Sequence, residues 1–186
     1  MKKYDKNTKS AFSKALTEDM RSDWSTPPAV CRALDGEFHF TLDACARADN
    51  ALCSLFFTKE QNGLMQSWRG HRVYCCPPSG RKSFELWTEK SSREALQKDT
   101  IVVMLLPAST DAGWFHKYIL NQPGVVVRFL DHRIPFENSL TPSYALDRAE
   151  DENGKKKAHG GMRPSMVVIF TGKKRKFRVE SMHIEY

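Results

Sequence analysis

Three short runs of apolar residues, many of them β-branched, constrain the fold of this chain more than any other feature. They lie at residues 100–106 (TIVVMLL), 124–130 (GVVVRFL) and 165–171 (SMVVIFT). Unbroken apolar runs of this length are typical of strands that are buried on both faces, as in a parallel sheet covered by helices. The chain is therefore predicted to build its core around such a sheet.

Three further strands are predicted from weaker signals. The run at 73–76 (VYCC) is short and apolar, and two prolines follow it. Residues 38–43 alternate between apolar and polar types, which predicts a strand that ends at an acidic residue. The C-terminal residues 177–186 predict the last strand.

A helix is predicted at 28–34, before the first of these strands, because proline suits a first helical turn. Further helices are predicted at 82–97, where apolar residues have helical spacing, and at 112–120. Strands that alternate with helices indicate an α/β fold with a mostly parallel central sheet flanked by helices. A length of 186 residues fits one domain.

Charge and cysteine content narrow the classes of function. The net charge of +7 favours a polyanionic partner, nucleic acid before an anionic membrane. Five cysteines without C-x-x-C spacing predict neither a disulfide framework nor a zinc site, so no metal is expected. The polar N-terminus lacks a signal-peptide pattern and no segment is apolar enough to span a membrane, which predicts a cytoplasmic protein without a membrane partner.

The end of the strand predicted at 38–43 is one of two segments suited to chemistry. Ligands collect at the carboxyl ends of strands in open α/β sheets. Asp43 could meet a cationic ammonium group there, and the small residues Ala44, Cys45 and Ala46 leave room for a ligand near the backbone. This pattern fits an adenosine-type cofactor, and it also fits a plain acidic helix cap.

The second segment is the loop at 75–80 (CCPPSG). Its two prolines stiffen the backbone and remove two N–H donors, which leaves carbonyl groups free to accept hydrogen bonds from an exocyclic amine. A plain connection between a strand and a helix explains the same residues. Thiol chemistry at Cys76 would need a histidine, and His71 is near in sequence but has no orienting partner.

The order and spacing of these and further segments resemble the phage-type DNA N6-adenine methyltransferase (Dam) family. The resemblance spans residues 22–171, and no single motif carries it. The matching segments are 23–28 (DWSTPP), 42–46 (LDACA), 57–64 (FTKEQNGL), Trp68 with the diproline loop, 105–110 (LLPAST), Trp114-Phe115, 128–136 (RFLDHRIPF) and 167–170 (VVIF).

This resemblance implies a Rossmann-like methyltransferase domain over 23–186. The residues themselves predict a basic arm or short helix at 1–22 before this domain and a long polar loop near 138–162 within it. The implied activity moves a methyl group from S-adenosyl-L-methionine to the exocyclic amine of a DNA base, with adenine N6 the first candidate. The implied partner is double-stranded DNA, in the host cytoplasm if a phage encodes the chain. The expected state is a monomer or weak dimer.

The resemblance also assigns residues to the cofactor. Seven of them would surround the methionine end of S-adenosylmethionine: Trp24, Thr26, Pro27, Asp43, Ala44, Cys45 and Ala46. Glu60 matches an acid that holds the ribose hydroxyls, and Asn62 lies near the adenine, where the family usually has Asp. An amide can still accept and donate hydrogen bonds, so we expect binding to survive.

The catalytic loop departs from the family pattern. The family carries Asn or Asp, Pro, Pro and an aromatic residue, where this chain has Cys76, Pro77, Pro78 and Ser79. In the family pattern, the first side chain and a proline carbonyl accept the amine hydrogens, and the aromatic ring stacks on the flipped base. A thiol is a weak acceptor and serine cannot stack, which costs about 1–3 kcal/mol by analogy with other base-binding sites.

Three outcomes of this departure stay open. The enzyme could borrow another aromatic residue, such as Tyr74 or Phe84. It could act on a different amine or on a modified base. It could also bind cofactor and DNA without turnover, as a catalytically inactive member of the fold.

Contacts to DNA are predicted from charge and position. A duplex base must be flipped out before its amine can react. Arg81 and Lys82 follow the catalytic loop, and Arg133 lies in the 128–136 segment, so these three could hold phosphates. Each also fits an ordinary solvated surface charge.

Overall fold

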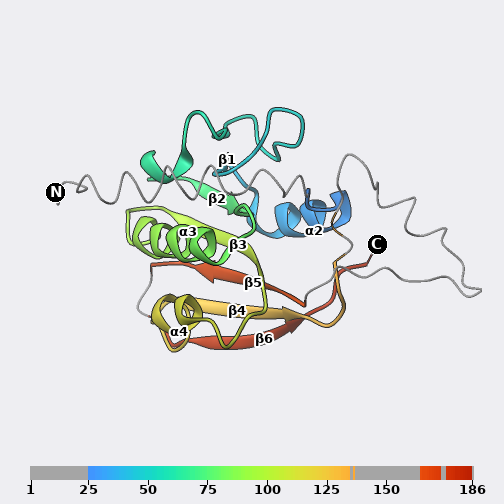
Figure 1. Ribbon diagram of the computed structural model, residues 1–186, viewed down its shortest axis with the longest axis vertical. Coiled ribbons are helices and arrows are strands. Elements are labelled where there is room, and N and C mark those ends of the chain that lie inside the picture. The colour runs from blue at the N-terminus through green and yellow to red at the C-terminus, as the bar shows by residue number, and fades with distance from the viewer. Residues whose placement is uncertain (1–24, 135, 137–163, 173–174, 186) are drawn as a thin grey trace, which may run out of the picture.

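The computed structural model describes residues 25–134, 136, 164–172 and 175–185 (Figure 1). The arm or helix predicted at 1–22, the predicted cofactor residue Trp24 and the loop predicted near 138–162 lie outside these ranges. The elements are, in order, α2 (Pro28–Phe38), β1 (Leu42–Asp43), η1 (Gly63–Met65), β2 (Arg72–Cys75), α3 (Arg81–Glu94), β3 (Ile101–Pro107), α4 (Gly113–Tyr118), β4 (Val125–Leu130), β5 (Ser165–Phe170) and β6 (Arg178–Met182).

The described strands form one six-stranded sheet in the order β1-β2-β3-β5-β4-β6. Parallel pairs join β1 to β2, β2 to β3 and β4 to β6, whereas β5 is antiparallel to both β3 and β4. The structure confirms the α/β class, but the sheet is mixed, so the predicted mostly parallel arrangement is not confirmed. The apolar run that forms β5 indicates burial on both faces and says nothing about strand direction.

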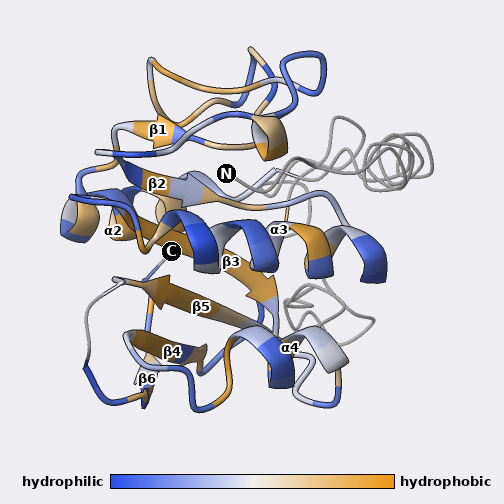
Figure 2. Ribbon diagram, turned by 90° about the vertical axis from the view of Figure 1, so that its left-hand side faces the viewer, coloured by the Kyte–Doolittle hydropathy of each residue, from blue (hydrophilic) through white to orange (hydrophobic). Residues whose placement is uncertain are grey.

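Helices cover both faces of the sheet, as the unbroken apolar runs predict. On one face, Trp87 of α3 and Trp114 of α4 join the strand side chains in a core. On the other face, Val30 and Leu34 of α2 do the same. Figure 2 shows the central strands as the most hydrophobic part of the ribbon, with α3 lying across them. Within the described ranges, no helix has the length and apolar character needed to cross a membrane.

All described strands except β5 run in the same direction, so their carboxyl ends meet at one edge of the sheet, here called the carboxyl edge. The ends of β1 and β2 lie at one side of this edge, and the ends of β4 and β6 lie at the other. The strands β3 and β5 separate the two sides. The strand ends that ligands favour are therefore divided into two groups.

The first residue of the strand predicted at 38–43 belongs to the helix α2 instead. This helix ends at Phe38, and His39 leaves it with a left-handed φ of 50°. The carboxylate of Asp35 then accepts a hydrogen bond from the N–H of Phe40 at 2.8 Å, which fixes the turn. Because β1 holds only two residues, the prediction of a strand that begins at residue 38 is wrong, whereas its acidic end is confirmed.

Candidate active site at the ends of β1 and β2

Asp43 is buried at the end of β1, and its carboxylate organises two loops. One oxygen accepts a hydrogen bond from the N–H of Cys45 at 3.3 Å, and the other accepts one from the N–H of Leu52 at 3.1 Å. Only 4% of Asp43 is exposed, and burial raises the pKa of its carboxyl group to about 6 despite these bonds. Among the described residues no cation pairs with it. A cationic ligand would therefore stabilise its ionised form.

The chain returns to the end of β1 before it enters β2. The N–H of Phe57 donates to the carbonyl of Asp43, and the N–H of Ala46 donates to the carbonyl of Phe57, each at 3.0 Å. Gly63 then lies against Ala44, because a Cβ at position 63 would be only 2.0 Å from the Ala44 carbonyl oxygen. These contacts place the predicted cofactor segments 43–46 and 60–62 side by side.

The turn that precedes Gly63 carries the other two predicted cofactor residues. Glu60 is exposed, and a hydrogen bond from the hydroxyl of Thr58 lowers the pKa of its carboxyl group. Asn62 adopts a left-handed φ of 51°, and its side-chain oxygen is buried without a hydrogen-bond partner among the described residues. Because buried polar atoms are nearly always paired in native proteins, this oxygen is suited to accept a hydrogen bond from a ligand.

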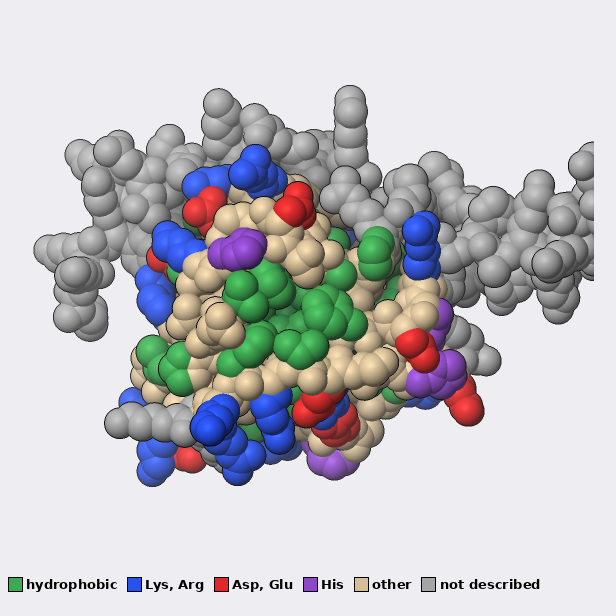
Figure 3. Space-filling model, turned by 90° about the horizontal axis from the view of Figure 1, so that it is seen from below, with side chains coloured by type: hydrophobic (Ala, Val, Ile, Leu, Met, Phe, Trp, Pro, Cys, Tyr) green, Lys and Arg blue, Asp and Glu red, His purple; other side chains and the backbone are tan. Residues whose placement is uncertain are grey.

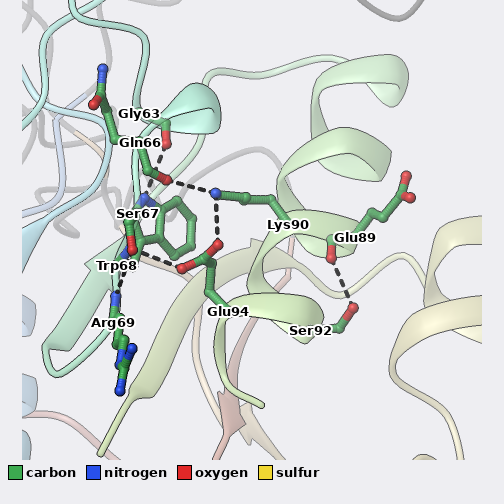
Figure 4. A network of polar contacts seen from close by, with 9 residues as sticks. All are labelled: Gly63, Gln66, Ser67, Trp68, Arg69, Glu89, Lys90, Ser92 and Glu94. Carbon is green, nitrogen blue, oxygen red and sulfur yellow. Dashed lines mark hydrogen bonds and ion pairs between the residues drawn. The ribbon is translucent and has the colours of Figure 1, made fainter. Parts of the chain in front are cut away.

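A buried ion pair on α3 holds the residues that follow this turn (Figure 4). The Nζ of Lys90 lies 2.8 Å from Oε1 of Glu94 and donates to the carbonyl of Gln66 at 2.6 Å. The other Glu94 oxygen accepts a hydrogen bond from the N–H of Trp68 at 2.8 Å. The indole of Trp68 donates to the carbonyl of Gly63 at 3.0 Å. α3 therefore fixes the backbone behind the candidate cofactor site.

Cys76 follows β2, and its thiol lies against two hydroxyl groups. The hydroxyls of Thr26 and Tyr74 are 2.7 Å apart, and both side chains hydrogen-bond to the thiol. Burial raises the pKa of Cys76 to about 12, so the thiol stays neutral at physiological pH. The His71 ring lies at the opposite edge of the sheet, where it contacts the hydroxyl of Thr41 at 3.1 Å. The arrangement does not provide the thiolate that nucleophilic chemistry needs.

Two more thiols join the ends of β1 and β2. The sulfur atoms of Cys45 and Cys75 are 3.8 Å apart, and burial raises the pKa of both thiols. The backbone N–H of Cys76 also donates to the sulfur of Cys45. The predicted cofactor residue Cys45 is thus in direct contact with the predicted catalytic loop.

The diproline loop leads from β2 into α3. Pro77 is buried, Pro78 is half-buried and Ser79 is exposed, and Gly80 precedes the helix with a φ of 136°. Within the described part of the chain, no group donates a hydrogen bond to the carbonyl oxygen of Cys76 or Pro77. Both carbonyl oxygens therefore keep the capacity to accept hydrogen bonds from an amine.

Neither aromatic residue considered as a substitute stacking partner lies open at this loop. Tyr74 is 3% exposed, and its hydroxyl is engaged by Thr26. Phe84 is 8% exposed and packs against Trp114, with ring centroids 5.9 Å apart. Both are core side chains, so the structure does not support a borrowed aromatic from either position.

The three predicted DNA contacts lie in two places. Arg81 and Lys82 are exposed at the start of α3, beside the diproline loop, and Lys82 lies 3.5 Å from Glu85. Arg133 is exposed beyond the end of β4, on the other side of β3 and β5. The structure therefore brings Arg81 and Lys82 to the candidate active site and leaves Arg133 apart from it.

A cluster of titratable side chains beside Arg133 was not predicted from the sequence. Asp131 and His132 follow β4, and His183 follows β6 close to them. An Asp-His pair directly after a strong strand signal was the available clue. The pairing of β4 with β6, which brings residue 183 alongside, was not predictable from spacing.

The sequence of this chain is similar to known proteins. Residues 13–185 match the family described as DNA N-6-adenine-methyltransferase (Dam). A DNA N-6-adenine-methyltransferase of Escherichia phage T1 is 33% identical over 98 residues, which are 52% of this chain and 40% of the phage T1 protein. The chain thus aligns with less than half the length of that relative. Because the family match extends over nearly all of its residues, the chain belongs to the Dam family of DNA N-6-adenine-methyltransferases.

Proposed function

We propose that this chain transfers a methyl group from S-adenosyl-L-methionine to the exocyclic amine of a base in double-stranded DNA, with adenine N6 the first candidate. Membership of the Dam family supports the reaction class. One observation carries the proposal: a buried carboxylate and two open carbonyl groups meet at the ends of neighbouring strands β1 and β2. In a Rossmann-like methyltransferase, which we take this fold to be, ligands bind at such strand ends.

The residues after β1 fit this methyl donor. The ammonium group of S-adenosylmethionine would compensate the buried charge of Asp43, which has no cationic partner among the described residues. The unpaired amide oxygen of Asn62 suits the amino group of the adenine, and the exposed Glu60 suits the ribose hydroxyls. When bound, the donor supplies an electrophilic methyl group on a sulfonium.

The residues after β2 would prepare the amine. The carbonyl oxygens of Cys76 and Pro77 would accept hydrogen bonds from the two N–H groups of the amine. These bonds would turn the nitrogen lone pair out of conjugation with the base. The thiol of Cys76 stays neutral and adds only a weak acceptor. Arg81 at the start of α3 would hold a phosphate next to the flipped base.

Mass analysis of nucleosides from unmethylated DNA that has been incubated with the protein and S-adenosylmethionine tests the proposal. We expect N6-methyladenine above background, and loss of both product and cofactor binding in Asp43→Ala. The matched control is Asp99→Asn, which changes an exposed acid at the opposite edge and should leave both measurements unchanged. The absence of every methylated nucleoside would overturn the proposal.

A non-catalytic protein that binds cofactor and DNA is the second candidate. The exposed Ser79 in place of an aromatic residue favours it, as does the burial of Tyr74 and Phe84. Calorimetric binding of S-adenosylmethionine and of DNA, without any methylated product, would identify this case. A methylated nucleoside other than N6-methyladenine would instead identify a different target base.

A further inference from the structure

A second group of titratable side chains lies on the carboxyl edge, where β4 and β6 end. Oδ1 of Asp131 is 2.5 Å from Nδ1 of His132, and Oδ2 of Asp131 is 2.9 Å from Nδ1 of His183. One ligand atom from each of the three residues lies within 4.8 Å of the other two. Among the described residues, no other group of three His, Cys, Asp or Glu is this compact.

We propose that Asp131, His132 and His183 form a binding site for a divalent first-row transition-metal ion, with Zn²⁺ the best fit. Two imidazole nitrogens and a carboxylate oxygen are ligands that zinc, nickel and cobalt share, whereas Mg²⁺ and Ca²⁺ prefer oxygen alone. Three protein ligands leave a coordination position for water or for an anionic group.

The distances are close to those of a coordination shell. Ligand bonds of about 2.0–2.2 Å to a tetrahedral zinc ion separate the ligand atoms by roughly 3–3.5 Å. Relative to this spacing, the 2.5 Å contact from Asp131 to His132 needs to open by about 0.5–1 Å, and the 2.9 Å contact to His183 by up to about 0.6 Å. Solvent exposure of 28% for the side chain of His132 and 65% for that of His183 leaves room for this movement.

The site is open to solvent and compact. The rings of His132 and His183 meet edge to face, with centroids 5.2 Å apart. In Figure 3, histidine and acidic side chains gather at the right-hand side of the face shown.

An ion at this place would tie two segments together at the carboxyl edge. Leu130 pairs with Met182, so the ligands follow directly on β4 and β6. Strands lie about 4.8 Å apart, and three such steps separate β2 from β4, which puts the ion roughly 15 Å from the diproline loop. The ion would therefore not act on the methyl group. It would fix the chain that carries Arg133 and add positive charge beside this predicted phosphate contact.

The proposal departs from the expectation of no metal site. That expectation rested on cysteine spacing, whereas these ligands are histidines and an acid that only the pairing of β4 with β6 brings together. The competing explanation is a hydrogen-bonded His-Asp-His group that holds no ion.

Calorimetric titration of the full chain with ZnCl₂, after removal of metals, separates the two explanations. We expect one saturable ion per chain and at least tenfold weaker binding in His183→Ala and in Asp131→Asn. The matched control is His116→Ala, which removes an exposed histidine on α4 and should leave the affinity unchanged. Zinc should also raise the thermal unfolding midpoint of the wild type and of His116→Ala but not of His183→Ala.

The free cysteines at β1 and β2 provide thiol ligands as well, so total zinc uptake does not decide the matter. The absorption spectrum of the Co²⁺ form distinguishes nitrogen and oxygen ligands from thiolates. Absence of saturable binding, equal affinity in His183→Ala, or a thiolate spectrum would each overturn the proposal. All three outcomes are independent of methyl transfer, so they leave the proposed function untouched.

Discussion

The two sides of the carboxyl edge each carry an acid, and the two acids lie in opposite environments. Asp43, after β1, is 4% exposed, and two backbone N–H groups hold its carboxylate, whose pKa burial raises to about 6. Asp131, after β4, is exposed, and two histidine side chains lower its pKa. Backbone hydrogen bonds thus fix the carboxylate of Asp43 in one position, which suits one cationic ligand. The side chains around Asp131 can rearrange around a metal ion.

The contacts that hold the chain behind each side of the carboxyl edge also differ: they are buried at the first side and exposed at the second. Behind β1, the buried pair of Lys90 and Glu94 on α3 fixes the backbone through Gln66 and Trp68. Behind Asp131, the contacts come from residues on the exposed β6 side of the sheet. Substitutions behind the first side should therefore cost more folding free energy than substitutions at the second.

The largest effect is expected from Lys90→Met. Removing one partner of a buried ion pair leaves the charge of Glu94 uncompensated, which should lower the free energy of unfolding by about 3–5 kcal/mol. Urea unfolding measures this change. The matched control is Lys82→Met in the exposed pair with Glu85, where the change should stay within about 0.5 kcal/mol. Equal effects of the two substitutions would show that the network in Figure 4 does not support the site.

The next effect is a pH dependence that Asp43 imposes on stability. Its pKa is about 6 in the folded chain and 3.8 ordinarily, so the folded chain binds the proton more tightly. This contribution to stability is complete below pH 3.8 and is lost as the pH rises through 6, and it amounts to about 3 kcal/mol. Denaturant unfolding between pH 4 and pH 8 measures it, and Asp43→Asn should remove it.

Cofactor binding should show the opposite trend with pH. An ammonium group favours the ionised form of Asp43, so the affinity for S-adenosylmethionine should rise as the pH increases through 6 and then level off. Asp99→Asn should keep this profile. An affinity that is flat from pH 5 to pH 8 would show that the cofactor does not meet the carboxylate of Asp43.

A gain of function of about tenfold is expected when the family pattern is restored in the catalytic loop. The double substitution Cys76→Asn with Ser79→Tyr supplies a stronger acceptor and an aromatic ring, and stacking on a base contributes about 1–3 kcal/mol. Methyl transfer to duplex DNA under single-turnover conditions measures the change. The control is Ser92→Tyr on the far end of α3. Unchanged or lower activity in the double variant would show that the loop serves a different amine.

The outline of this fold was predictable because its strongest signals are local. Unbroken runs of apolar residues predict β3, β4 and β5. The candidate site residues after β1 and β2 lie at the ends of shorter runs. The residues suggested the roles of Asp43 and the diproline loop, and family resemblance supplied S-adenosylmethionine and a DNA base as their ligands. The burial of Asp43 and the orphan oxygen of Asn62 are consistent with those roles but do not test them.

The features that escaped prediction depend on partners distant in sequence. The antiparallel direction of β5 follows from its place between β3 and β4, which an apolar run does not encode. The alternation at 38–43 suggested a strand, yet Phe38 and Phe40 stack on each other at the end of α2, with centroids 5.8 Å apart. The cluster around Asp131 needs the pairing of β4 with β6.

The smallest effects are expected from substitutions of exposed arginines, one on each side of the carboxyl edge. Their effects on DNA binding show whether both sides contact DNA. Arg81→Ala beside the diproline loop and Arg133→Ala beside Asp131 should each weaken binding to duplex DNA about threefold to tenfold. Each should also reduce the slope of log affinity against log salt by about 1, because each removes a phosphate contact. Lys98→Ala, at the opposite edge of the sheet, is the control and should change neither quantity. Fluorescence anisotropy at several salt concentrations measures both quantities. A loss in Arg81→Ala alone would confine DNA to the β1 and β2 side, and the ion proposed at Asp131 would then lie outside the footprint of DNA.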